Sequence, residues 1–288
     1  MPHTGVLFAV PVADEKRGLM HILRLNRSTA SCFTLLILLA TASPFLSAQD
    51  NGTAAPTPTP AAPPTAKAAA PEDLTGQWIS VVTEDWGYRM IMPPKADYLG
   101  VPLNPAGRKV ADNWDPAKDE AAGEQCKSYG APAILRAPGR IRISWASDDT
   151  LKIEADAGTQ SRMLYFKEPT AAGGDWQGVS QASWERVPGG PFFGGGGPRY
   201  VAQLSGSLKV VTTKMRPGYL RKNGVPYSDK ATLTEFFDRT TEPDGVSLLV
   251  VTTVVDDPTY LVQPFIVSNH FRKQADESGW NPTPCTSR

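Results

Sequence analysis

Short segments with strictly alternating apolar and polar residues constrain the fold of this chain most strongly. Three of them follow one another closely: RIRISWA at 140–146, TLKIEAD at 150–156 and TQSRMLYF at 159–166. Alternation with a period of two places one set of side chains on one face of a β-strand. Asp148-Asp149 and Ala157-Gly158 separate the segments and suit turns. The region therefore predicts an antiparallel meander.

Six further segments have the composition of strands. They are LTGQWISVVT at 74–83, DWQGVSQASWE at 175–185, SLKVVTTKM at 207–215, TLTEFFDRTT at 232–241, VSLLVVTTVVDD at 246–257 and PFIVSNHFRK at 264–273. Pro243-Asp244-Gly245 fixes a turn, because proline restricts φ and glycine accepts a positive φ. Residues 232–257 are thus predicted to form a hairpin.

About nine short strands without intervening periodic helices exclude a parallel α/β sheet. We predict a mainly β fold, a closed antiparallel β-barrel of about nine strands, since closure removes exposed strand edges. A β-sandwich is the alternative. One or two short helices are expected near 105–123, where Pro105 and Pro116 suit first helical turns.

The N-terminal region has the layout of an export signal. Arg24 and Arg27 precede the apolar run at 33–40, and Ser47-Ala48 resembles a cleavage site. Residues 1–48 are interpreted as leader and signal peptide, with Met20 as an alternative start. The apolar run is shorter than a membrane-spanning helix, which needs about 20 residues. We expect an exported protein, periplasmic or extracellular, whose mature chain has no transmembrane segment.

The mature chain is predicted to consist of a linker and one domain. Residues 49–72 are rich in Pro, Ala and Thr and contain no large apolar side chain. Such a segment buries too little surface to offset its chain entropy, so we expect a disordered tether. Residues 73–288 are assigned to a single β-barrel domain.

Two cysteines remain after the signal is removed. Cys126 and Cys285 form an even pair in an exported chain, which favours a disulfide. Two free thiols are the alternative.

Composition excludes several function classes. Lys+Arg and Asp+Glu number 29 each, and a nucleic-acid-binding protein would have a basic excess. His270 is the only histidine after residue 48, which argues against a zinc site. No GxSxG, GxxxxGK[ST] or GxGxxG motif is present. We therefore expect no metal, no cofactor and no catalytic residue, and a binding protein rather than an enzyme.

His270 itself is not expected to act in catalysis. Strict alternation places it on one strand face with Ser268 and Arg272. That face supplies no acid partner for the imidazole.

Trp86, Tyr88, Arg89 and Met92 form the candidate ligand site. They cluster before Pro93-Pro94, and aromatic rings beside one cation suit the rim of a barrel mouth that stacks on a ligand. Ordinary core packing of an irregular segment is the alternative.

A second cluster is basic. It contains Lys214, Arg216, Tyr219, Arg221 and Lys222. It suits either an anionic ligand or an acidic surface, and the alternative is a solvated loop.

Two resemblances add to this interpretation. Gly76-Gln77-Trp78 resembles the G-x-W pattern in the first strand of lipocalin and calycin barrels. The resemblance implies that Trp78 closes the barrel floor and that an arginine near the last strand, here Arg272, packs over it. Residues 102–116, 207–239 and 254–265 are similar to a group of secreted bacterial proteins without an assigned activity, which implies export and a single domain.

Three functions are carried forward. The first is an exported, non-catalytic β-barrel module that binds a small apolar or aromatic molecule. The second is a secreted two-carboxylate hydrolase acting on a polysaccharide, although Glu235 and Asp238 are expected on opposite strand faces. The third is a structural protein that contacts the cell envelope. An open apolar cavity would favour the first, a Trp-lined cleft with paired acids the second, and a filled barrel the third.

Overall fold

The computed structural model describes residues 62–186 and 206–287. The predicted leader and signal peptide at 1–48, with its cleavage site, lies outside the described residues. So does the linker up to residue 61.

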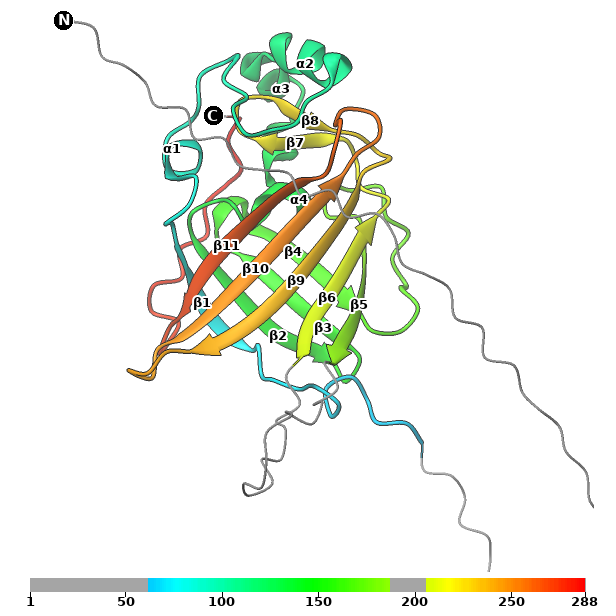
Figure 1. The fold of residues 1–288 in the computed structure, drawn as a ribbon, viewed down its shortest axis with the longest axis vertical. Coiled ribbons are helices and arrows are strands. Elements are labelled where there is room, and N and C mark those ends of the chain that lie inside the picture. Colours follow the sequence, from blue (N-terminus) through cyan, green and yellow to red (C-terminus); the bar gives the residue numbers. More distant parts are fainter. Residues whose placement is uncertain (1–61, 187–205, 288) are drawn as a thin grey trace, which may run out of the picture. The chain divides into compact units, whose positions relative to one another are not determined.

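Nine strands form a closed barrel (Figure 1). They are β1 (Gly76–Val81), β2 (Arg140–Ser147), β3 (Thr150–Ala155), β4 (Gln160–Tyr165), β5 (Val179–Arg186), β6 (Gly206–Thr213), β9 (Thr232–Thr241), β10 (Ser247–Asp256) and β11 (Phe265–Lys273). Their order around the barrel is β1-β11-β10-β9-β6-β5-β4-β3-β2. The structure confirms the predicted barrel, with the meander at β2–β4 and the hairpin at β9–β10.

One neighbouring pair departs from the expected antiparallel arrangement. β4 and β5 pair in parallel, with Leu164 beside Ser180 and Tyr165 beside Gln181. A parallel pair needs a connection that returns the chain to the starting end of the first strand, which takes about a dozen residues or more. The segment 166–178 is long enough to do so.

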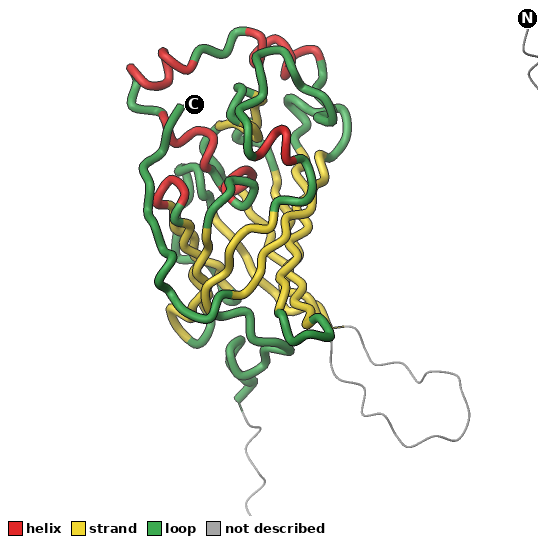
Figure 2. Tube along the Cα trace, turned by 90° about the vertical axis from the view of Figure 1, so that its left-hand side faces the viewer, coloured by secondary structure: helices red, strands yellow, loops and turns green. Residues whose placement is uncertain are grey.

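A cap of short elements lies over one end of the barrel (Figures 1 and 2). It contains α2 (Pro105–Asp112), α3 (Pro116–Ala121), η1 (Gln125–Tyr129), α4 (Ala131–Ile134) and the hairpin of β7 (Gly218–Arg221) with β8 (Val225–Tyr227). The first two confirm the helices expected near 105–123. Each has proline in its first turn and an N-cap side chain, Asn104 or Asp115, that accepts a backbone hydrogen bond.

Two smaller elements complete the described chain. α1 (Trp86–Arg89) follows β1, and η2 (Ala157–Thr159) lies in the turn between β3 and β4. α1 is a single turn and begins after Asp85, whose φ of 50° is left-handed. This unusual backbone geometry turns the chain sharply as it leaves the barrel.

The barrel interior is filled. Trp78, Phe237 and Phe271 are almost fully buried in a cluster of barrel residues that also includes Tyr129 of η1 and Ile134 of α4. A second cluster, which includes Tyr227 and Leu233, joins the cap to the barrel. Close packing of this kind leaves little room for a ligand inside the barrel.

A polar layer separates the two clusters. Six consecutive strands each contribute one buried polar residue to it, namely Arg162, Ser180, Thr212, Glu235, Thr253 and Asn269. Nη2 of Arg162 lies 2.7 Å from Oε2 of Glu235, and Nη1 lies 3.2 Å from Oε1. Nη2 also donates to the hydroxyls of Thr212 and Ser180. The charges are therefore paired across the barrel.

The folded unit begins within the segment that composition assigns to the linker. The backbone N–H of Ala66 donates to Asp149, and its carbonyl accepts from the indole N–H of Trp184. Glu72 accepts from the backbone N–H of Arg239. Residues 66–72 therefore pack on the barrel end away from the cap.

A disulfide ties the C-terminal tail to the cap. Cys126 in η1 is bonded to Cys285, with their Cα atoms 5.1 Å apart. This confirms the predicted pairing. It closes a loop that contains almost the whole barrel.

Trp78 is buried on β1, and its indole N–H donates to the carbonyl of Leu74. The cation over its ring is Lys273, whose Nζ lies 5.4 Å from the ring centroid. The expectation that Arg272 packs there is wrong. The strand register pairs Trp78 with Lys273 and Ile79 with Arg272, so Arg272 is on the outer face and exposed.

Candidate functional site

A cavity of about 250 Å³ lies in the cap, and we call it the cap cavity. Its walls come from α1 and the segment after it, from α4 and the residues that follow, and from the end of β7. The lining residues are Tyr88, Arg89, Met90, Ile91, Met92, Pro93, Ser128, Ala133, Arg136, Ala137, Pro138, Leu220, Arg221 and Lys222. The lining combines four cationic residues with apolar ones, and we call the consecutive residues Met90, Ile91, Met92 and Pro93 its apolar side.

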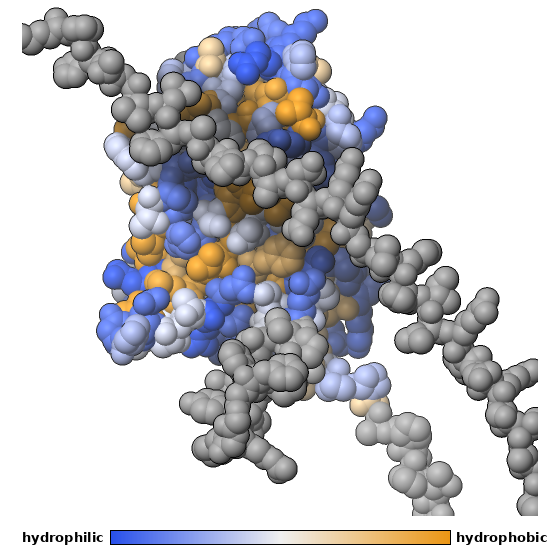
Figure 3. Space-filling view, viewed as in Figure 1, coloured by the Kyte–Doolittle hydropathy of each residue, from blue (hydrophilic) through white to orange (hydrophobic). Residues whose placement is uncertain are grey.

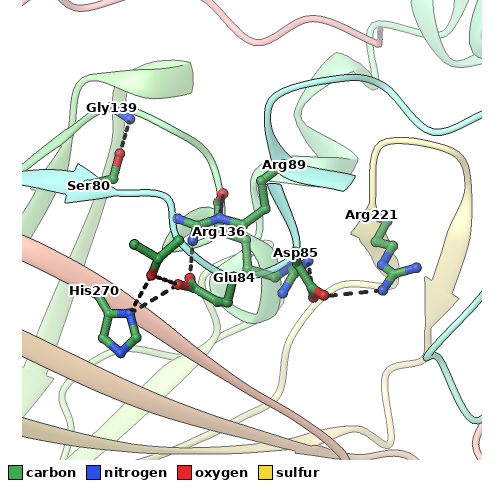
Figure 4. Close-up of polar contacts among 9 residues, drawn as sticks. Ser80, Glu84, Asp85, Arg89, Arg136, Gly139, Arg221 and His270 are labelled. Atoms are coloured by element: carbon green, nitrogen blue, oxygen red, sulfur yellow. Dashed lines mark hydrogen bonds and ion pairs between the residues drawn. The ribbon is translucent and has the colours of Figure 1, made fainter. Parts of the chain in front are cut away.

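Three arginines from separate segments contribute to the cationic lining (Figure 4). Arg89 ends α1, Arg136 follows α4, and Arg221 ends β7. Their side chains are 0%, 6% and 2% exposed, respectively. We call them the arginine cluster. Long charged side chains are seldom buried so completely unless they are paired.

Two consecutive carboxylates hold the cluster. Glu84 forms an ion pair with Nη1 of Arg89. Oδ2 of Asp85 lies 3.2 Å from Nη2 of Arg136 and 4.0 Å from Nη2 of Arg221. The sharp turn at Asp85 brings both carboxylates toward the arginines.

Local packing fixes the three guanidinium groups. α4 is entirely buried, which anchors Arg136 immediately after it, and Nε of Arg89 donates to the Arg136 carbonyl at 2.9 Å. Nη1 of Arg221 donates to the carbonyl of Leu99 at 2.7 Å. Its guanidinium carbon lies 4.2 Å from the centroid of the Tyr88 ring, a cation–π contact.

The β7–β8 hairpin positions the rim of the cavity. Gly224 has a φ of +81°, and a Cβ there would overlap the ring of Trp114. The buried Asn223 beside it donates to the carbonyls of Pro94 and Asp97. The hairpin therefore fixes residues 94–97, which follow the apolar lining residues Met90–Pro93 in the chain.

The electrostatics of the site are dominated by unbalanced positive charge. Burial, and to a smaller extent repulsion by Arg136, lowers the pKa of Arg89 and of Arg221. Burial likewise lowers the pKa of Arg136. Lys222 adds a further cation, and its Nζ donates to the hydroxyl of Tyr129 at 2.7 Å.

His270 lies at the edge of this network, on β11. Its Nδ1 is 3.0 Å from Oε2 of Glu84 and 3.3 Å from the hydroxyl of Thr83 (Figure 4). The expectation that it lacks an acid partner is wrong, because the acid comes from the segment after β1 and not from its own strand. Nearby, the Ser80 hydroxyl accepts from the backbone N–H of Gly139.

The structure brings together three of the four predicted ligand residues. Tyr88, Arg89 and Met92 line the cap cavity. Trp86 is on the other side of α1, where it lines a separate depression with Ile79. These positions rule out core packing for Trp86, which is 59% exposed.

The predicted basic cluster divides into two parts. Arg221 and Lys222 line the cap cavity. Arg216 pairs with Glu124, and Tyr219 donates to Asp119. The solvated-loop alternative describes Lys214 and Arg216, which are exposed between β6 and β7. It is wrong for Tyr219, Arg221 and Lys222, which belong to a largely buried hairpin.

Sequence reasoning missed several contributors. The signal for Arg136 is a single charge inside the apolar run APAILRAP, and the signal for the hairpin is the turn dipeptide Asn223-Gly224. Glu84 and Asp85 had no signal, because their partners are distant in the chain.

Candidate carboxylate pairs for hydrolysis are not brought together. Glu235 is buried in the polar layer, whereas Asp238 is exposed. Both carboxylates at the cap cavity are ion-paired with arginine. Glycoside hydrolysis instead needs a carboxylic acid that faces a second carboxylate.

Within the described residues, no group of three or more His, Cys, Asp or Glu side chains could hold a metal ion. No helix of the described part is long and apolar enough to cross a membrane. No family model, curated protein or solved structure matches the chain. The site is therefore interpreted from its own geometry.

Proposed function

We propose that the protein is an exported, non-catalytic binding module for a small molecule with an apolar or aromatic part. The observation that carries the proposal is the cap cavity, whose lining combines apolar residues with the buried arginine cluster. Its volume of about 250 Å³ is just below the range of about 300–1,000 Å³ that is usual for ligand pockets. The ligand is therefore small.

The apolar side is suited to an aromatic or aliphatic group. Met90, Ile91 and Met92 are consecutive, and all three are exposed to solvent. Methionine is flexible and polarisable, so it adapts to ligands of different shape. Tyr88 adds a ring whose face contacts Arg221 and whose hydroxyl donates to Asp97. Covering this apolar surface would stabilise a complex.

The filled barrel has a scaffold role in this proposal. Packed side chains close its interior to a ligand. The proposed ligand site is therefore the cap cavity and not an open barrel lumen. Sites whose residues are held by rigid elements bind with less loss of entropy. The barrel, the disulfide and the β7–β8 hairpin together fix the walls of the cap cavity.

Export is supported by two features. The N-terminal sequence has the pattern of a signal peptide. The Cys126–Cys285 disulfide belongs in an oxidising compartment.

Native mass spectrometry of the protein purified from its own compartment tests the proposal. We expect a bound small molecule that is released by denaturation. Tyr88→Leu should lower its occupancy, and Val262→Ala, an exposed apolar change outside the lining, should not. Ligand-free protein that also binds no aromatic or aliphatic probe would refute the proposal.

A second candidate, the envelope-interaction protein, is favoured by two observations. The first is that the barrel is filled rather than open, and the second is a set of exposed apolar side chains. Trp86 and Leu99 are 59% and 74% exposed, and Met90 and Ile91 lie between them in the chain. Figure 3 shows further apolar patches over the barrel strands and the cap. Contiguous exposed apolar surface commonly marks a contact with a partner. Co-sedimentation with isolated envelopes, lost in Trp86→Ser but kept in Tyr88→Leu, would support this function instead.

A further inference from the structure

The arginine cluster carries more positive charge than its own carboxylates neutralise. Arg89, Arg136 and Arg221 form ion pairs with two carboxylates, Glu84 and Asp85. A third carboxylate, Asp97, acts electrostatically on Arg221. Lys222 lines the same cavity, and its recorded hydrogen bonds go to hydroxyl groups. Buried like charges repel one another strongly because the local dielectric constant is low. A further anion at this place would relieve the repulsion.

The cluster also has unused hydrogen-bond donors. Nη2 of Arg89, Nη1 of Arg136 and Nε of Arg221 are buried and have no hydrogen-bond partner among the described residues. Buried polar atoms are nearly always bonded, so unpaired ones on residues that line a cavity point to a missing acceptor. Three donors from three guanidinium groups suit a ligand with two or more oxygen acceptors.

The other groups at the cavity do not supply that acceptor. Oε1 of Glu84 pairs with Arg89, and its Oε2 is shared by His270 and Thr83. Oδ2 of Asp85 is already shared by Arg136 and Arg221. The residues of the apolar side, Met90, Ile91, Met92 and Pro93, have no anionic group.

We propose that the arginine cluster binds the oxyanion of a small amphipathic ligand, a carboxylate or a phosphate, while the apolar side of the cap cavity holds its carbon skeleton. The inference rests on the proposed function and adds the chemical class of the ligand. Arginine suits this role because its planar guanidinium forms two parallel hydrogen bonds to a carboxylate or phosphate. The carboxylates Glu84 and Asp85 orient the guanidinium groups and leave their remaining donors for the ligand.

Probes that share a phenyl group test the inference, and two of them, phenylacetate and phenylacetamide, are matched in shape and differ in charge. Phenylacetate, phenylacetamide and phenyl phosphate are titrated into the full mature protein by calorimetry, with saturation-transfer NMR for weak binders. At least one anion should bind ten or more times as tightly as the amide, a difference of about 1.4 kcal/mol. The ratio of phenylacetate to phenyl phosphate affinity shows which oxyanion is preferred.

Variants connect the discrimination to the cluster. Arg136→Gln and Arg221→Gln should each reduce the anion-to-amide ratio about tenfold. Arg272→Gln makes the same change at an exposed position on β11 and should leave the ratio unchanged. Because the buried arginines also hold the cap, circular dichroism must first show that the variants are folded. Competition between inorganic phosphate and an anionic probe for the wild-type protein tests anion binding without a variant.

The outcomes separate the two proposals. If the amide binds wild-type protein as tightly as both anions, the inference about charge is wrong and the binding function stands. If none of the three probes binds and no ligand co-purifies, both are wrong. If the ratio falls equally in Arg272→Gln, the anion is held by general surface charge and the arginine cluster is not its site.

Discussion

The ion pair in the barrel interior offers a sharp test of what holds this fold together. Arg162 and Glu235 are 2% and 0% exposed in their side chains. Their two contacts, at 2.7 and 3.2 Å, form a bidentate pair. The substitution Glu235→Gln keeps the size and shape of the side chain and removes its charge. It leaves the guanidinium buried without a counterion.

The expected cost follows from this geometry. Breaking one partner of a buried pair destabilises a protein by about 3–5 kcal/mol. Arg162 keeps its hydrogen bonds to Thr212 and Ser180, so we expect the lower half of that range. The total stability of a domain is typically about 5–15 kcal/mol. The variant should therefore fold but be much less stable.

Urea unfolding followed by tryptophan fluorescence measures the effect. With an m-value of about 2–3 kcal/mol/M, the midpoint should fall by about 1–2 M. Asp238→Asn is the matched control, because it removes a carboxylate from the same strand at an exposed position. Its midpoint should change by an amount that corresponds to no more than about 0.5 kcal/mol.

A double variant distinguishes pairing from packing. Arg162→Met with Glu235→Met removes both charges and keeps most of the volume. Ser180 and Thr212 still bond each other across 2.8 Å. Such replacements are often neutral or stabilising by about 1–4 kcal/mol. If Glu235→Gln costs less than about 1 kcal/mol, or the double variant is no more stable than the single one, the reasoning about an uncompensated charge is refuted.

Three further predictions concern stability. Thiol titration under denaturing conditions should find no free thiols, and two reactive thiols would disprove the disulfide. Cys285→Ser should lower the unfolding midpoint, and the loss of stability should be no more than about 5 kcal/mol for so long a loop. Burial raises the pKa of Glu72 from 4.5 to about 7. The folded state therefore binds the proton more tightly than the unfolded state, and stability should fall by about 1–2 kcal/mol as pH rises from 4.5 to 7. Urea unfolding at several pH values measures this fall, and an equal fall in Glu72→Gln would contradict the prediction. His270→Gln removes the contact with Glu84. It should lower stability by about 1 kcal/mol in thermal unfolding and leave ligand binding unchanged. Loss of binding would show that His270 belongs to the site.

The strands could be read from the sequence because their signal is local. The ends of all nine barrel strands fall within four residues of the ends of the predicted segments, since alternation and turn residues act over a few positions. The pairing of Cys126 with Cys285 followed from there being only two cysteines after residue 48. The helices at 105–121 followed from their N-terminal prolines. These features needed no knowledge of distant contacts.

The candidate site was only partly predictable. Tyr88, Arg89 and Met92 were identified from composition, but their partners Arg136 and Arg221 lie about 50 and 130 residues away in the chain. An arginine looks the same in a sequence whether it becomes buried beside a carboxylate or stays in solvent. Its role is set by burial and by neighbours that meet only after folding.

The sequence by itself thus determined a mainly β chain, the strand segments, and the cysteine pair. Only the tertiary structure decided that the barrel is filled, that β4 and β5 run parallel, and that Lys273 rather than Arg272 covers Trp78. It also decided that three arginines converge on one cavity. The physical reason is that strand propensity depends on side chains a few positions apart, whereas register, packing and charge pairing depend on residues that the closed barrel and its cap bring together.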